Sequence, residues 1–112
     1  MKEQISWADF EKVDMRTGTI VEAKVFEEAR NPAFQLIIDF GPELGLKKSS
    51  AQITDLYNPY SLIGQQVIAV VNFPSKQIAN MMSECLVLGI PSLKGVVLLQ
   101  PEQSIENGLS IA

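Results

Sequence analysis

Hydrophobic and polar residues alternate along much of this chain, a pattern that predicts β-strands rather than long helices. From Phe34 to Phe40 every second residue is large and apolar, as expected for a strand with one buried face. The segment from Met15 to Val25 predicts a longer strand, with odd-numbered residues on one side and even-numbered residues on the other. Gly18 lies inside that strand and predicts a bend or a close backbone approach, as at a barrel corner.

Shorter apolar runs complete the predicted set of strands. A third strand is predicted near residues 46–53, a fourth at 66–72, a fifth at 84–89 and a surplus one at 96–99, with a turn at 41–45 and a loop at 91–95. Residues 55–60 predict irregular or short helical structure, and Ser6 with Asp9 has the spacing of a helix capping box. This order predicts a mainly β fold: a five-stranded OB-fold Greek-key barrel with a short N-terminal helix and extra C-terminal strands.

The stretch from residue 67 to residue 79 carries the most information about function. An apolar strand pattern ends at Asn72, Pro74 cannot donate to a strand ladder, and the lone cation Lys76 follows. A second apolar run comes soon after Ser83. Two buried strands joined by a polar, proline-bearing crossing predict a functional rim on a small barrel. The crossing has an amide, a cation and a hydroxyl but no acid–base pair, which favours binding over catalysis.

The composition narrows the classes of function. The chain has 112 residues, enough for one domain with a modest core. It has no histidine and one cysteine, Cys85, so the usual general base and zinc ligands are missing, and we expect no catalytic site, metal or cofactor. No apolar stretch approaches the ~20 residues of a membrane span, and no signal peptide is visible. We therefore expect no membrane insertion and a reduced, cytoplasmic location.

The charge pattern argues against a general polyanion-binding protein, because the formal net charge is −4. Most of the acidic residues lie in the first part of the chain. From residue 47 to residue 82, however, the charged residues are Lys47, Lys48 and Lys76 against Asp55. This distribution allows a small cationic face on an acidic protein.

Several segments, taken in order, resemble one known family closely. They are DMRTGTIV at 14–21, LIIDFG at 36–41, KSSAQIT at 48–54, VVNFP at 70–74 and SE at 83–84. This set resembles the CsaA group of the tRNA-binding domain family, which also includes free-standing tRNA-binding proteins and domains attached to methionyl- and phenylalanyl-tRNA synthetases. The resemblance covers nearly the whole chain in order and spacing.

The resemblance implies one tRNA-binding-type OB-fold domain over residues 1–112. It also implies a homodimer, and residues 1–13 and 90–112 are the expected interface. Two activities follow from it: a non-enzymatic chaperone that holds unfolded or export-bound polypeptides, or alternatively a protein that binds tRNA by its structure. Arg16, Asn72, Lys76 and the Ser83–Glu84 pair match the family's rim positions.

Together these arguments predict a binding rim with a polar part and an apolar part. The polar part, which would contact RNA phosphates or a peptide backbone, consists of Arg16, Lys47 or Lys48, Ser50, Gln52, Asn72, Lys76 and Ser83. The apolar patch, which would hold apolar side chains, consists of Phe73, Pro74 and Ile78.

Each of these residues also has a purely structural interpretation. Arg16 has the guanidinium geometry that binds phosphate well, but an ion pair with Asp14 or Glu22 is the alternative. Adjacent lysines point to opposite faces of a strand, so at most one of Lys47 and Lys48 serves a given groove, and both suit a guarded strand edge. Ser50 and Gln52 suit a half-exposed strand, Asn72 suits a turn, and the apolar residues suit core or dimer packing.

Two departures from the family pattern favour polypeptide over RNA as the ligand. Relatives often have Gly where this chain has Asn80, and more than one cation where it has only Lys76. The Met81–Met82 pair adds flexible apolar side chains, which adapt to irregular partners. An enzyme is a distant third interpretation, since no second feature supports a catalytic carboxylate pair.

Overall fold

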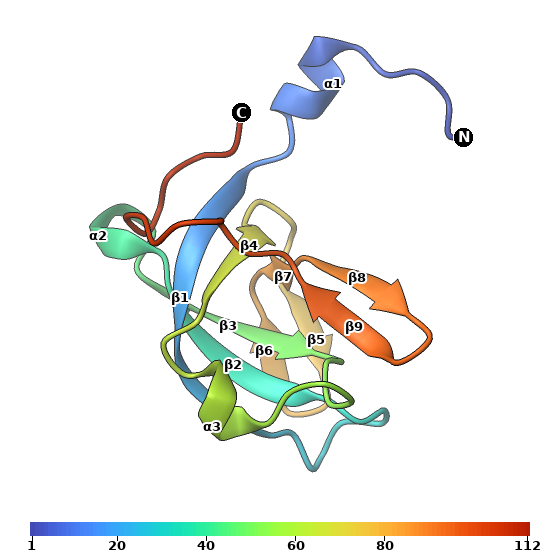
Figure 1. Ribbon diagram of the computed structural model, residues 1–112, viewed down its shortest axis with the longest axis vertical. Coiled ribbons are helices and arrows are strands. Elements are labelled where there is room, and N and C mark those ends of the chain that lie inside the picture. Colours follow the sequence, from blue (N-terminus) through green and yellow to red (C-terminus); the bar gives the residue numbers. More distant parts are fainter.

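A single antiparallel sheet of five strands curls into a barrel in the computed structural model, which describes residues 1–112 (Figure 1). The sheet order is β3-β2-β1-β4-β7. The five strands are β1 (Met15–Val25), β2 (Phe34–Asp39), β3 (Leu46–Ala51), β4 (Gln66–Val70) and β7 (Leu86–Val87). The predicted OB-fold barrel is confirmed.

The barrel closes between β3 and the chain entering β7, partly through side chains. The Glu84 backbone N–H donates to the Lys48 carbonyl at 2.8 Å, and the Glu84 carboxylate accepts from the Lys48 backbone N–H at 2.9 Å. Next to this pair, the Ser49 hydroxyl donates to the Cys85 carbonyl at 3.1 Å, and Ser49 is fully buried. The seam is therefore made by charge-assisted and hydroxyl hydrogen bonds as well as by backbone bonds.

The chain has three short helices. Helix α1 (Trp7–Glu11) precedes the first strand, α2 (Gly41–Leu44) connects β2 to β3, and α3 (Pro59–Leu62) connects β3 to β4. The predicted capping box is confirmed, because the Ser6 hydroxyl accepts from the Asp9 N–H and the Asp9 carboxylate accepts from the Ser6 N–H. The segment predicted as a turn at 41–45 contains one helical turn instead. None of the helices has the length and apolar character needed to cross a membrane.

The core lies inside the barrel. Its largest fully buried side chains include Phe40, Ile20, Leu36, Ile38 and Leu62. The predicted strict alternation along β1 is wrong. A β-bulge between Ile20 and Glu22 shifts the register, so that both Ile20 and Ala23 contact the core.

The close approach predicted at Gly18 is confirmed. A Cβ at Gly18 would lie 2.6 Å from Ile38 and 2.8 Å from the Phe40 ring. Only a residue without a side chain fits where β1 crosses the core at this point.

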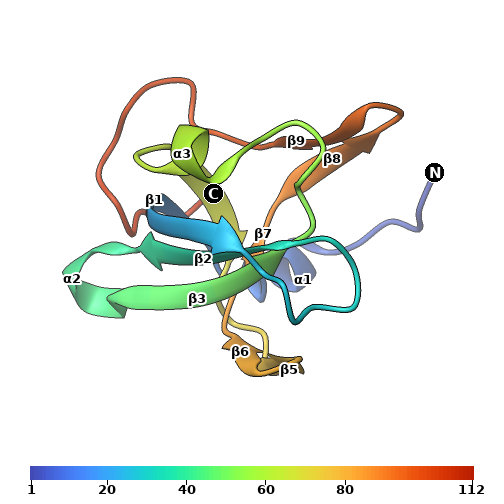
Figure 2. The same ribbon diagram turned by 90° about the horizontal axis from the view of Figure 1, so that it is seen from below.

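The segment between β4 and β7 forms a hairpin that the sequence did not predict. Strands β5 (Lys76–Ile78) and β6 (Met81–Ser83) pair with each other and stand away from the main sheet (Figure 2). A small apolar cluster of Phe26, Ala33 and Met81, with Ile78 packed against it, holds the hairpin to the barrel. Met81 is thus a packing residue, whereas Met82 is 43% exposed.

The C-terminal part differs from prediction in a second way. The predicted strand at 84–89 is only two residues long, and a separate hairpin follows, β8 (Gly89–Ser92) with β9 (Gly95–Leu98). The predicted loop at 91–95 is therefore wrong at three positions, because Pro91 and Ser92 lie in β8 and Gly95 lies in β9. Because β8 pairs only with β9, Pro91 sits on an edge strand, where its missing N–H is tolerated.

The final residues run beside the start of β1 (Figure 1). The Thr17 N–H donates to Leu109 at 3.1 Å, the Gly108 N–H donates to Thr17 at 2.7 Å, and the Ile111 N–H donates to Met15 at 3.0 Å. The first part of β1 is consequently paired on both sides, by β4 and by this C-terminal segment.

Candidate binding site

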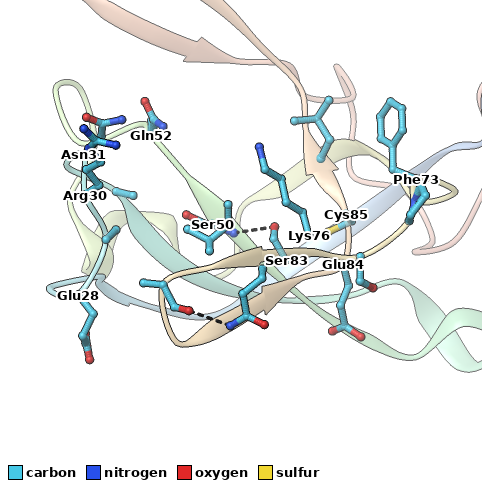
Figure 3. A pocket seen from close by; sticks show the side chains of 18 residues that line it. Glu28, Arg30, Asn31, Ser50, Gln52, Phe73, Lys76, Ser83, Glu84 and Cys85 are labelled. Atoms are coloured by element: carbon cyan, nitrogen blue, oxygen red, sulfur yellow. Dashed lines mark hydrogen bonds between the residues drawn. The ribbon is translucent and has the colours of Figure 1, made fainter.

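An open groove of about 1380 Å³ lies on one side of the barrel. It lies between the β1–β2 connection, the end of β3, the β4–β5 connection and the entry to β7 (Figure 3). We call it the rim groove. Four separate segments build it: residues 28–33, 50–52, 73–79 and 83–86.

One end of the rim groove is apolar. Phe73 is 55% exposed and Leu86 is 49% exposed, and Pro74 lies next to Phe73. Such exposure of large apolar side chains beside a groove is typical of a surface that binds apolar groups. The middle of the groove is polar, because the Ser83 hydroxyl accepts from the Ser50 N–H at 3.1 Å.

The cations and the acids of the rim groove differ in whether they have bonding partners. Lys76 and Arg30 form no ion pair, since the only ion pairs within 4.0 Å in the chain are made by Arg16. The two acids are engaged elsewhere: Glu28 accepts from Asn80 at 3.3 Å and Glu84 from the Lys48 N–H. Figure 3 shows both carboxylates pointing away from the Lys76 ammonium. The rim groove therefore combines an apolar end with two cations that form no ion pair, although the protein as a whole is acidic.

The groove brings together seven of the predicted site residues and leaves out four. Those that line it are Ser50, Gln52, Phe73, Pro74, Lys76, Ile78 and Ser83. Those that do not are Arg16, Lys47, Lys48 and Asn72. Ile78 contributes only partly, because it also packs against the small apolar cluster under the hairpin.

Arg16 is engaged in structural contacts. Its Nε donates to Asp14 at 2.6 Å, its Nη1 donates to the Gly108 carbonyl at 3.0 Å, and its side chain is 15% exposed. The hydrogen bond to Asp14 raises the pKa of Arg16 above its ordinary value. The structure thus shows the ion pair that sequence analysis gave as the alternative to phosphate binding.

Asn72 also makes internal hydrogen bonds. Its side-chain oxygen accepts from the Asp14 N–H at 3.0 Å, and its Nδ2 donates to the Lys12 carbonyl at 2.7 Å. It joins the start of the β4–β5 connection to the chain between α1 and β1. Asn72 therefore positions the residue beside it, Phe73, rather than lining the groove itself.

Lys48 lines a second, smaller groove of about 670 Å³ on the outer face of β1, β2 and β3. We call this the lateral groove. Lys24, Gln35, Ile37, Ile63 and Met82 also line it. Lys47 lines neither groove and lies on the other face of β3, as adjacent residues of a strand must.

Sequence analysis missed the contribution of the β1–β2 connection. Glu28, Arg30 and Asn31 line the rim groove, but none of them was among the predicted site residues. A signal was available, because the loop between the first two strands flanks the ligand-binding face of many OB-folds. Applied here, that rule would have singled out Arg30 as the one cation in this loop.

Cys85 lies at the floor of the rim groove but is not a reactive thiol. Burial raises its pKa from an ordinary value of 9.0 to about 11, so it stays protonated near neutral pH. No group of three or more histidine, cysteine or acidic residues lies close enough to hold a metal ion.

Known structures similar to this one include two CsaA chaperones. The crystal structure of chaperone CsaA from Bacillus anthracis is 54% identical, covers 98% of this chain and 100% of its own, and has a TM-score of 0.91. The CsaA chaperone protein from Picrophilus torridus is 51% identical, covers 97% of this chain and 100% of its own, and has a TM-score of 0.92. The predicted resemblance to the CsaA group is confirmed.

Curated relatives and a family model give a second view. Methionine–tRNA ligase from Methanococcoides burtonii is 32% identical over 111 residues, which are 98% of this chain but only 16% of the ligase. The chain thus spans about a sixth of the length of such relatives, and the activity of the whole ligase does not transfer to it. The model for a putative tRNA binding domain matches residues 15–110. This chain therefore belongs to the tRNA-binding domain family and resembles its CsaA members.

Proposed function

We propose that this protein is a non-enzymatic chaperone that binds unfolded or export-bound polypeptides in the cytoplasm. The observation that carries the proposal is the rim groove, where half-exposed Phe73 and Leu86 lie beside hydrogen-bonding groups such as Gln52 and Ser83. An unfolded chain presents apolar side chains and unpaired backbone groups together. A groove with both kinds of partner suits it, and no nucleophile or cofactor is required.

The similarity to two chaperone structures supports the same proposal. Both match this chain over at least 97% of its length and 100% of their own, at 51% identity or more.

The test is suppression of aggregation of a chemically denatured client without ATP, measured by light scattering. We expect stoichiometric suppression by the natural protein and a loss of most of it in Phe73→Ser. The matched control is Tyr60→Ser, which changes an aromatic residue that is 89% exposed on α3, outside both grooves. Absence of suppression at several-fold excess, or equal suppression by Phe73→Ser, would contradict the proposal.

Binding of tRNA is the second candidate function, and the free cations of the rim groove favour it. Arg30 and Lys76 can each contact a phosphate, and the family model describes a putative tRNA binding domain. Filter binding at several salt concentrations tests this function. Removing one phosphate contact by Lys76→Ala should reduce the salt slope by about 0.7–0.9, whereas Lys94→Ala, in the β8–β9 turn, should leave it unchanged. A salt-independent signal would exclude this function.

A homodimer is part of the proposal, because several apolar residues lie uncovered away from the grooves. Helix α1 buries none of its residues, and Trp7 is 86% exposed. The β8–β9 hairpin leaves Ile90 59% exposed, and Ile111 near the C-terminus is 37% exposed. A second copy covering residues 1–13 and 90–112 would bury them. Sedimentation should show a dimer that Trp7→Ser weakens, and a stable monomer at micromolar concentration would contradict this part.

A further inference from the structure

The lateral groove has apolar walls that nothing in the chain covers. Ile63 is 52% exposed and Met82 is 43% exposed, and both line the groove together with Ile37 on β2. The polar part of the lining consists of Glu22, Lys24, Gln35, Lys48 and Asn80. Methionine adapts its shape to irregular apolar partners, so this groove suits an apolar side chain of variable form.

The β5–β6 hairpin is the ridge between the two grooves. Residues 73–79 line the rim groove, and residues 80–82 line the lateral groove. Two cross-strand pairs of the hairpin span the boundary. Ile78 and Met81 pack against the barrel, whereas Gln77 and Met82 both have exposed side chains. Paired side chains on neighbouring strands lie about 5 Å apart, so a ligand that leaves the rim groove over Gln77 immediately meets Met82.

A cross-strand pair of the main sheet also joins the two grooves. Gln35 on β2 lines the lateral groove, its direct partner Ser50 on β3 lines the rim groove, and the two side chains share the outer face of the sheet. The two cavities are therefore neighbouring parts of one surface.

We propose that a polypeptide held in the rim groove continues over the hairpin, and that the lateral groove binds a second apolar side chain of the same chain. This inference rests on the proposed chaperone function. Because the two grooves are continuous, the polypeptide that occupies the rim groove can also occupy the lateral groove. No aromatic residue lines the lateral groove, so it lacks the stacking platform that single-stranded nucleic acid uses.

Two connected sites for apolar side chains predict that affinity depends on how many apolar residues a peptide has and on the spacing between them. Once the first apolar side chain is bound, the second binds intramolecularly, at an effective concentration in the ~mM range for a short flexible spacer. A peptide with two apolar anchors should bind at least about tenfold more tightly than a peptide with one, provided that the spacer can cross the ridge. A spacer too short to span it should give no gain.

The experiment uses fluorescent peptides with one or two leucines separated by glycine–serine spacers of increasing length. Affinities are measured by anisotropy for the natural protein, Met82→Ser, Phe73→Ser and the Tyr60→Ser control. We expect Met82→Ser to reduce the two-leucine affinity to the one-leucine level. We expect Phe73→Ser to weaken both peptides, and Tyr60→Ser to weaken neither. Ile63→Ser provides a second variant at another exposed apolar residue of the lateral groove and should act like Met82→Ser.

The results separate failure of this inference from failure of the proposed function. If one-leucine peptides bind through Phe73 but a second leucine adds nothing, or its gain survives Met82→Ser, the inference is overturned and the chaperone function stands. If no peptide binds, both are overturned. If Met82→Ser and Lys24→Ala weaken binding of an RNA oligonucleotide and leave peptides unaffected, the lateral groove belongs to nucleic acid and the inference is wrong.

Discussion

The start of β1 and the β5–β6 hairpin are both β-structure attached to the same barrel, but their surroundings differ. The start of β1 is paired on both sides, and the Arg16 guanidinium there has hydrogen bonds to Asp14 and Gly108. The hairpin pairs only with itself and contacts the barrel through a small apolar cluster and the Ser83–Ser50 bond. At the start of β1 the Arg16 side chain bonds to other parts of the protein, whereas in the hairpin Lys76 forms no ion pair. Polar residues at similar strand ends thus serve stability in one place and remain available to ligands in the other.

The largest expected effect comes from the closely packed region. Gly18→Val would force a side chain to within 3 Å of Ile38 and Phe40. We expect a loss of about 3 kcal/mol in the free energy of unfolding, the upper end of what overpacking usually costs. Urea denaturation measures it, with Val21→Thr on the exposed side of the same strand as the control. An unchanged midpoint for Gly18→Val would show that the barrel is looser here than the geometry indicates.

Arg16→Ala should have the next largest effect. It leaves the Asp14 carboxylate and the Gly108 carbonyl without this partner, and we expect a loss of about 2 kcal/mol. Hydrogen exchange of the Ile111 amide, which donates to Met15, should accelerate because the C-terminal segment opens. Peptide binding in the rim groove should stay intact. A protein of normal stability that has lost ligand binding would instead place Arg16 in the site.

Cys85, which follows the hairpin and lies before β7, predicts a pH effect. Its pKa is about 11 in the folded protein against an ordinary 9.0, so the folded state keeps a proton that the unfolded state loses. This stabilisation is complete below pH 9 and is lost as the pH rises through 11, and the loss between pH 8 and pH 10.5 is about 2 kcal/mol. Comparing urea midpoints at pH 8 and pH 10.5 tests it. Cys85→Ala should show the smaller alkaline loss, and equal losses in both proteins would rule the effect out.

The smallest expected effect is in the hairpin turn, and it has the opposite sign. Ala79 has a φ of +49°, a conformation that favours glycine. Ala79→Gly should relieve this strain and stabilise the hairpin by about 1 kcal/mol. Thermal denaturation measures the gain, and Ala29→Gly, in the β1–β2 connection, is the control that should give none. A destabilised Ala79→Gly protein would mean that the turn is not strained.

The barrel was predictable because the residues of its longest strands already show, within each strand, the features of β-structure. The alternation from Phe34 to Phe40 and the glycine inside the strand at 15–25 needed no knowledge of distant residues. The bulge after Ile20 was not predictable, since it depends on how β1 turns from β4 to β2. Pairs of strands as short as β5 and β6 show no period to detect, and Phe26 and Ala33, which hold them, are far away in sequence.

The binding site was predictable where its residues lie close together in the sequence. Phe73, Pro74 and Lys76 follow one another and all line the rim groove. Arg16 was placed in the rim because it matches a rim position of the family, although its ion pair with Asp14 was a visible alternative. Its bond to the Gly108 carbonyl, 92 residues away, could not be read from the sequence. Arg30 was missed for the same reason, because only the folded chain brings its loop beside Lys76.

The last join of the barrel, between β3 and the chain entering β7, has a further consequence. It depends on the side chains of Glu84 and Ser49 as well as on backbone bonds. Backbone ladders have one fixed spacing, but a carboxylate and a hydroxyl can be shortened, lengthened or exchanged by single substitutions. The width of the opening beside this join is therefore a property that individual mutations can tune, while every other strand pairing stays as it is.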